Sequence, residues 1–231
     1  MARTQTASIV LAAASATEVC AAQTPSAAGG FTINGGAASG GVATLDAARR
    51  ILFTTAGAEA GKIAVVTGTD RNRNVQKESV TLVTTSTVAT KMDFLTVTSI
   101  SISSNAAGNI SVGTNGVAST RWLVLSAFGD SPVGVAVTLG GATANVSVEG
   151  TLDDFDAAQV MARPDAAAAT QAANNILLFV PPVPFGLTGL TTLTADTLGS
   201  TAIPLRAIRL TVNSGATSVG TKITALQPQP R

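Results

Sequence analysis

The side chains that carry most enzyme chemistry are scarce in this chain. It contains no His and no Tyr, and its one Cys is Cys20. Proton transfer in enzymes relies most often on His, and neither a Ser-His-Asp nor a Cys-His arrangement can be assembled without it. A single Cys also excludes an internal disulfide and leaves no Cys and His set for zinc. We therefore expect no catalytic residues, no cofactor and no enzymatic activity.

Two segments imitate ligand-binding loops but depart from them at essential positions. Residues 57–62 look like a phosphate-binding loop, yet their glycines are one residue too close, and Ile63 stands where Ser or Thr would bind magnesium. Asp70, Asn72 and Asn74 match the first three ligands of an EF-hand calcium loop. The glycine and the bidentate Glu that follow in that loop are missing, so a polar turn between two strands is the better interpretation.

A third candidate for chemistry is the acidic group Asp153, Asp154 and Asp156. These carboxylates could ligate a metal or act as an acid and base pair. Carboxylates after a strand more often cap the start of a helix, because their oxygens accept hydrogen bonds from the free N–H groups of the first turn. We favour the helix cap and predict no metal site.

Two short segments are the predicted contacts with other subunits. Arg49 and Arg50 could pair with acidic groups of a neighbour, although a charged strand edge that resists aggregation is an equally good interpretation. Trp122 is the only Trp and follows Arg121. A single aromatic residue in an apolar run is more often a core or interface anchor than a ligand platform. We therefore predict interface roles for Arg49, Arg50, Arg121 and Trp122.

Short segments with apolar residues at every second position dominate the chain and must position these side chains. The clearest are residues 63–69, 75–83, 94–102, 133–139 and 207–212. Alternation of this kind, separated by turn residues, predicts strands of an antiparallel sheet with one buried face. The sequence therefore predicts an all-β fold, either an antiparallel β-sandwich or a jelly-roll-like domain.

The composition changes along the chain and suggests its organisation. Residues 1–44 are rich in Ala, Gly, Ser and Thr and carry few charges, so we predict an extended N-terminal arm that is flexible or ordered by a neighbour. We assign the β-sandwich domain to residues 45–231. Inside it, residues 153–204 contain Ala-rich and Pro-rich stretches, which predict an irregular insertion with one or two short helices.

The overall composition limits the partners. Of 231 residues only 12% are charged and 3% aromatic, while 45% are hydrophobic. A surface left to small polar residues is suited to burial against other subunits. The net charge of +1 argues against nucleic acid as a partner, because phosphate binding needs clustered Lys and Arg. No apolar run approaches the roughly 20 residues that span a bilayer, so we expect a soluble protein with an uncleaved N-terminus and no membrane partner.

Several motifs along the chain, none of them catalytic, carry a resemblance to a known class of proteins. They are Cys20-Ala-Ala-Gln-Thr-Pro, Phe31-Thr-Ile-Asn-Gly, Ala48-Arg-Arg-Ile-Leu-Phe-Thr, Val66-Thr-Gly-Thr-Asp, Phe94-Leu-Thr-Val-Thr-Ser-Ile, Val112-Gly-Thr-Asn-Gly-Val-Ala-Ser, Val148-Glu-Gly-Thr-Leu-Asp-Asp and Pro204-Leu-Arg-Ala-Ile-Arg-Leu. In this order they resemble small structural proteins of tailed bacteriophages. The resemblance covers most of the chain.

This resemblance implies a β-rich virion component without an active site. We expect a head decoration or cement protein that binds the major capsid protein and itself, as a homotrimer on the capsid surface after synthesis in the host bacterial cytoplasm. The alternative is a neck, collar or tail component around the portal axis, with portal or neck proteins as partners. A weaker alternative is a host-surface-binding module.

Overall fold

The structure is a computed structural model that describes residues 2–125, 132–141, 143–153, 184–217 and 220–228. Within these ranges every helix or strand is a β-strand, and the sheets are antiparallel. The predicted all-β, antiparallel fold is confirmed. In chain order the strands are β1 (Ala2–Ser8), β2 (Cys20–Gln23), β3 (Gly29–Gly30), β4 (Ala38–Ser39), β5 (Val42–Thr55), β6 (Ile63–Thr69), β7 (Val75–Thr81), β8 (Thr87–Ile102), β9 (Ile110–Ser119), β10 (Leu123–Val124), β11 (Val133–Thr138), β12 (Asn145–Thr151), β13 (Phe185–Gly186), β14 (Thr197–Thr201), β15 (Ala207–Ser214) and β16 (Lys222–Pro228).

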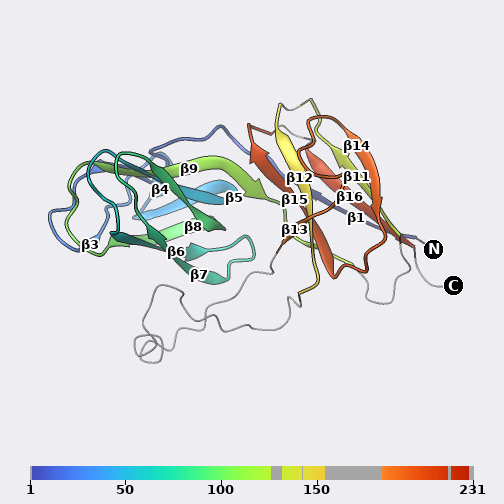
Figure 1. The fold of residues 1–231 in the computed structure, drawn as a ribbon, viewed down its shortest axis with the longest axis horizontal. Helices are drawn as coiled ribbons and strands as arrows, with labels where there is room; N and C mark the ends of the chain where they lie inside the picture. The colour runs from blue at the N-terminus through green and yellow to red at the C-terminus, as the bar shows by residue number, and fades with distance from the viewer. Residues whose placement is uncertain (1, 126–131, 142, 154–183, 218–219, 229–231) are drawn as a thin grey trace. The chain divides into compact units, whose positions relative to one another are not determined.

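The described residues form two compact units (Figure 1). Unit 1 contains those within 1–14, 116–155 and 182–231, and unit 2 contains those within 15–115. Strand β9 contributes residues to both units. The chain therefore divides differently from the predicted single domain at 45–231.

Unit 1 is β-sandwich-like, with two antiparallel sheets. The first, called here the four-stranded sheet, has the order β1-β16-β11-β14. The second contains β13, β12, β15 and the end of β9, with β10 beside β15. Apolar side chains alternate along the central strands of both sheets, and Val135, Ile223, Val148 and Leu210 are at most 2% exposed. This alternation gives each sheet one buried face, as the sequence predicted.

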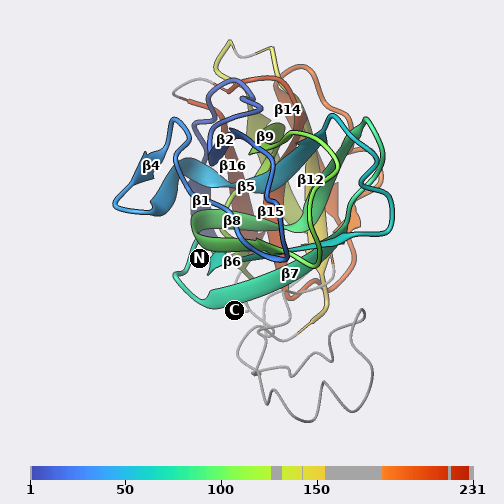
Figure 2. The same cartoon turned by 90° about the vertical axis from the view of Figure 1, so that its left-hand side faces the viewer.

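Unit 2 is organised around two long strands, β5 and β8, of 14 and 16 residues. Their pairing is interrupted by register shifts, which increase the twist and bend of a sheet. Alternating residues of β5, β8 and β9, among them Phe53, Phe94 and Ile110, are fully buried in one hydrophobic cluster. Strand β4 and the start of β5 form a projecting hairpin (Figure 2), whose turn residues Gly40 and Gly41 both have the positive φ that such tight turns require.

Residues 1–44 differ from the predicted extended arm. Strand β1 pairs with β16 along its full length, and Ile9 and Leu11 are buried in unit 1. Farther along, Val19 and Phe31 belong to the hydrophobic cluster of unit 2. The Ala, Gly, Ser and Thr of this segment obscure a few well-spaced apolar residues, and these residues tie the segment into both units. The arm prediction is thus corrected to a segment that is integral to both units.

Most of the predicted irregular insertion at residues 153–204 lies outside the described residues. Residues 154–183, with the predicted short helices and the Pro-rich stretch, belong to that part. The described remainder contains β13 and β14, and Leu187 and Leu190 between them are nearly fully buried. Residues 184–204 are therefore an ordered part of unit 1.

Candidate interaction surface

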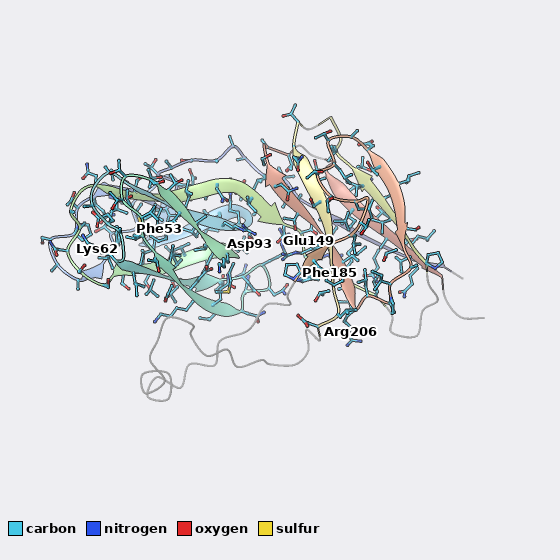
Figure 3. All side chains as sticks on the ribbon, viewed as in Figure 1. Phe53, Lys62, Asp93, Glu149, Phe185 and Arg206 are labelled. Carbon is cyan, nitrogen blue, oxygen red and sulfur yellow. The ribbon has the colours of Figure 1, made fainter. Side chains whose placement is uncertain are left out.

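The segment that imitates a phosphate-binding loop is joined by hydrogen bonds to a second loop within unit 2. The side chain of Glu59 is fully buried and accepts hydrogen bonds from the backbone N–H groups of Ala107, at 2.6 Å, and Gly108, at 2.9 Å. It also accepts one from Lys62 Nζ at 2.7 Å, and Figure 3 labels Lys62. A Cβ atom on Gly57 would lie 2.5 Å from the backbone nitrogen of Gly108. The hydrogen bonds of Glu59 thus join the two loops, and the missing side chain of Gly57 permits their close approach.

The segment that imitates a calcium loop is a polar turn between β6 and β7, as the sequence predicted. Asp70 Oδ1 accepts hydrogen bonds from the backbone N–H groups of Asn72 and Asn74, both at 2.8 Å. Of the predicted acidic group, Asp154 and Asp156 lie outside the described residues. Among the residues that the structure describes, no three His, Cys, Asp or Glu side chains are grouped as a metal site.

The two arginines predicted at an interface have different environments in unit 2. Arg49 is 2% exposed; its Nη1 lies 3.1 Å from Asp46 Oδ1, and its Nη2 donates to the carbonyl of Asn115 at 2.6 Å. Its guanidinium is thus used within the unit and is not presented to another subunit. Arg50 has a side chain that is 38% exposed, and its Nε lies 4.0 Å from Asp93 Oδ1. Of the pair, Arg50 alone retains substantial exposure for an external contact.

The other predicted interface pair lies in unit 1. The guanidinium of Arg209 lies over the ring of Trp122, 4.6 Å from its centroid. Arg209 Nε donates to Glu149 Oε2 at 2.8 Å, and Figure 3 labels Glu149. One face of the indole ring is therefore already used by an internal cation–π contact. Arg121 is exposed, and its Nη2 donates to the carbonyl of Thr6 in β1 at 3.0 Å.

The outer face of the four-stranded sheet is a surface that only the strand register creates, so local sequence patterns do not predict it. The side chains of this outer face lie in three rows across the strands: Thr4, Leu226, Gly134 and Ser200; Thr6, Thr224, Ala136 and Leu198; and Ser8, Lys222 and Thr138. Lys222 is the one charged residue among them. Local alternation predicts which residues face outward on each strand. It does not predict that β1 and β14 flank β16 and β11.

This outer face has low relief and two apolar projections. Gly134 and Ala136 give the central strand β11 very small side chains, and a Cβ atom on Gly134 would meet only Leu226, at 3.7 Å. Leu198 is 85% exposed and Leu226 is 47% exposed. A nearly uncharged surface with exposed leucines is typical of a protein–protein contact, because it can be desolvated at little electrostatic cost.

Comparison with known proteins provides no family and no relative for this chain. Comparison with protein-family models, curated proteins and solved structures finds no match. Within the described ranges no helix is long and apolar enough to cross a membrane. The outer face of the four-stranded sheet, with Leu198 and Leu226 exposed on it, is therefore the candidate interaction surface.

Proposed function

We propose that this chain is a non-enzymatic structural protein of a tailed-bacteriophage virion, and specifically a decoration or cement protein that binds across major capsid subunits. The observation that carries the proposal is the outer face of the four-stranded sheet. Three rows of small side chains lie there with Lys222 as the single charge, and Leu198 and Leu226 project from them. The sequence resemblance to phage structural proteins supports the same role.

The composition of the outer face favours docking to a rigid lattice. Thr, Ser, Ala and Gly lose little side-chain entropy when a partner covers them. Burying an exposed leucine completely contributes about 1.5–3 kcal/mol, so Leu198 and Leu226 would anchor the contact. Strands lie about 4.8 Å apart and outward residues repeat about every 7 Å, so the face measures roughly 15–20 Å in each direction.

An area of this size is below the roughly 800 Å² that each partner buries in a standard stable complex. The contact of one face is therefore weak by itself. A capsid presents the same site many times, and copies that bind side by side and contact one another raise the overall affinity although each single contact is weak. Decoration of a lattice suits such a face better than a single one-to-one complex.

Other virion positions would use the same chemistry. A neck, collar or tail component around the portal axis is the alternative, and it differs from a decoration protein in copy number. A host-surface-binding module is less well supported, because one ring face of Trp122, the only Trp of the chain, is covered by Arg209. Such modules usually present exposed aromatic rings to their ligands.

The proposal is tested by binding to heads purified from phage that lacks the gene for this chain. Ala136→Glu and Thr224→Glu would each place a carboxylate at the centre of the outer face, and co-sedimentation with heads should weaken by about tenfold or more. Val75→Glu is the matched control, since Val75 is 68% exposed on β7 in unit 2. We expect this control to bind as the unchanged protein does.

Circular dichroism of all three variants would verify that they fold. Binding that is equally strong for the face variants and the control would contradict the role of the outer face. Failure of the unchanged protein to bind heads at any concentration would contradict the decoration role itself.

A further inference from the structure

The ends of the described sheets differ in how they are protected against pairing with another strand. An edge strand presents unpaired N–H and C=O groups, and proteins usually block such edges with charges, short length or a covering group. Edge strand β7 carries Lys77 and Glu78, and edge strand β13 has two residues. On edge strand β1, Arg121 donates to the carbonyl of Thr6 at 3.0 Å. Each of these three edges has one of the usual protections.

Strand β14, at the other end of the four-stranded sheet, has none of them among the residues that the structure describes. Its sequence Thr-Leu-Gly-Ser-Thr contains no charge and no Pro, and it pairs through one side with β11. Among the described strands, no other pairs with β14. Leu198 on this strand is 85% exposed, more than any other large hydrophobic residue described. An open, neutral edge with an exposed leucine is a site for strand addition.

We propose that β14 is a self-association site, at which a second copy of this chain adds its own β14 in antiparallel orientation. Pairing around a twofold axis at Gly199 aligns all five residues of the strand. Leu198 then lies opposite the partner's Ser200, and Thr197 lies opposite the partner's Thr201. No charged side chain enters the pair, so the two copies meet without like-charge repulsion.

This register also satisfies the backbone. In antiparallel pairs the outward-directed N–H and C=O groups belong to every second residue. The register pairs residue 198 with 200 and residue 197 with 201. The two residues of each pair direct their backbone N–H and C=O groups to the same edge of the strand, so the free groups of one copy meet the free groups of the other. The outer faces of the two copies then form one continuous surface, on which Leu198 is partly covered. A twofold contact of this kind closes at two copies.

The size of the contact sets its strength. Five residues of strand are about 17 Å long, and such an edge buries much less than the roughly 800 Å² per partner of a stable dimer. We therefore expect a dissociation constant of about 100 μM to 1 mM for the isolated protein. This inference deepens the proposed function, since copies held side by side on a capsid would pair more completely. It concerns the isolated protein, so its failure and a failure to bind heads are separate results.

Cross-linking through engineered cysteines tests both the contact and its register. In the double variant L198C/S200C, the thiol introduced at position 198 lies opposite the thiol introduced at position 200 of the second copy, within reach of a disulfide. The matched control is T4C/T6C, which places two exposed thiols at the same spacing on β1 of the same sheet. Cys20 is fully buried, and burial raises the pKa of its thiol to about 12, so it does not compete.

We expect mild oxidation to convert most of L198C/S200C to a covalent dimer, with at least fivefold less dimer from T4C/T6C and from the single variants L198C and S200C. Sedimentation equilibrium of the unchanged protein should show a mass that rises with concentration from 22.9 kDa toward twice that value. Leu198→Lys, which adds a charge to the edge as Lys77 and Glu78 do on β7, should abolish the rise. Cross-linking no better than T4C/T6C, or self-association that Leu198→Lys leaves unchanged, would overturn the inference.

Discussion

Replacing Glu59 with Gln should destabilise unit 2 by about 3 kcal/mol, because this buried carboxylate joins two loops. It accepts hydrogen bonds from Ala107 N–H, Gly108 N–H and Lys62 Nζ at 2.6, 2.9 and 2.7 Å. Glutamine keeps one acceptor oxygen but turns an N–H₂ group toward groups that can only donate. Lys62 Nζ then loses its carboxylate partner and keeps the carbonyl of Asn105, at 2.8 Å.

The magnitude follows from the kinds of contact that are lost. A hydrogen bond to a charged group contributes about 1.5–3 kcal/mol, and a buried donor left unpaired costs about 1–3 kcal/mol. Removing one partner of a fully buried ion pair costs about 3–5 kcal/mol. The Lys62 side chain is 19% exposed, so water partly replaces its lost partner, and the lower end of that range applies.

Urea denaturation monitored by circular dichroism at neutral pH measures this loss. Glu18→Gln is the control, since it removes a partly exposed carboxylate from the same unit. We expect a change below about 0.5 kcal/mol for this control. A loss of unfolding free energy below about 1 kcal/mol for Glu59→Gln would refute the reasoning, because the connection between the two loops would then not depend on the charge of Glu59.

The pH dependence provides a second readout of the same residue. Burial alone would raise the pKa of Glu59, but the Lys62 hydrogen bond, the two backbone N–H groups and the Lys62 charge outweigh it and lower the pKa from its ordinary value of 4.5. A lowered pKa contributes stability that is present above the unfolded-state value and is lost as pH falls through the folded-state value. The stability difference between the unchanged protein and Glu59→Gln should therefore narrow as pH falls below about 4.5.

The contribution of Glu78 to stability has the opposite pH dependence, and it is the same in the unchanged protein and in Glu59→Gln. Burial raises its pKa and outweighs the backbone N–H groups of Lys91 and Met92 that favour its charged form. Its contribution to stability is therefore present below the unfolded-state value and is lost as pH rises through the folded-state value. The contribution of Glu78 cancels when the two proteins are compared. A stability difference between them that stays constant from pH 7 to pH 3 would therefore contradict the ionised state of Glu59.

Three further predictions concern other buried or close contacts. Arg49→Met should cost about 3–5 kcal/mol in urea denaturation, whereas Arg50→Met should cost less than about 1 kcal/mol; equal effects would contradict the internal role of Arg49. Gly113→Ala should destabilise by about 1–3 kcal/mol, because the new Cβ would collide with the carbonyl oxygen of Ser15, and an unchanged urea midpoint would disprove this close approach. Arg209→Ala should shift the fluorescence of Trp122 and cost about 0.5–1 kcal/mol, and an unaltered spectrum would argue against the stacked cation.

The strands could be predicted where the alternation of apolar residues is local. The predicted strand at 63–69 has the same bounds as β6, and the predicted strand at 94–102 is the second half of β8. Each of these segments reveals its buried face without reference to any partner, because side chains of a strand alternate between two faces. The polar turn at Asp70 was predictable for the same reason, since its hydrogen bonds connect near neighbours.

Features that depend on distant pairing could not be predicted. Strand β1 pairs with β16 at the other end of the chain, and no local pattern in residues 1–44 specifies that partner. Arg49 looks like a surface residue in the sequence, and its burial follows from contacts with Asp46 and with the more distant Asn115. The outer face of the four-stranded sheet consists of ordinary strand residues, which become a surface of one character only through the register of four strands.

The measurement that tests the decoration role most directly is the copy number of this chain in purified virions, determined by quantitative mass spectrometry relative to the major capsid protein. A decoration protein follows the symmetry of the capsid lattice, so we predict a ratio equal to that of the capsid protein or a simple fraction of it. About a dozen copies or fewer would contradict decoration and favour the neck or tail position. Absence from purified particles would contradict a structural role in the virion.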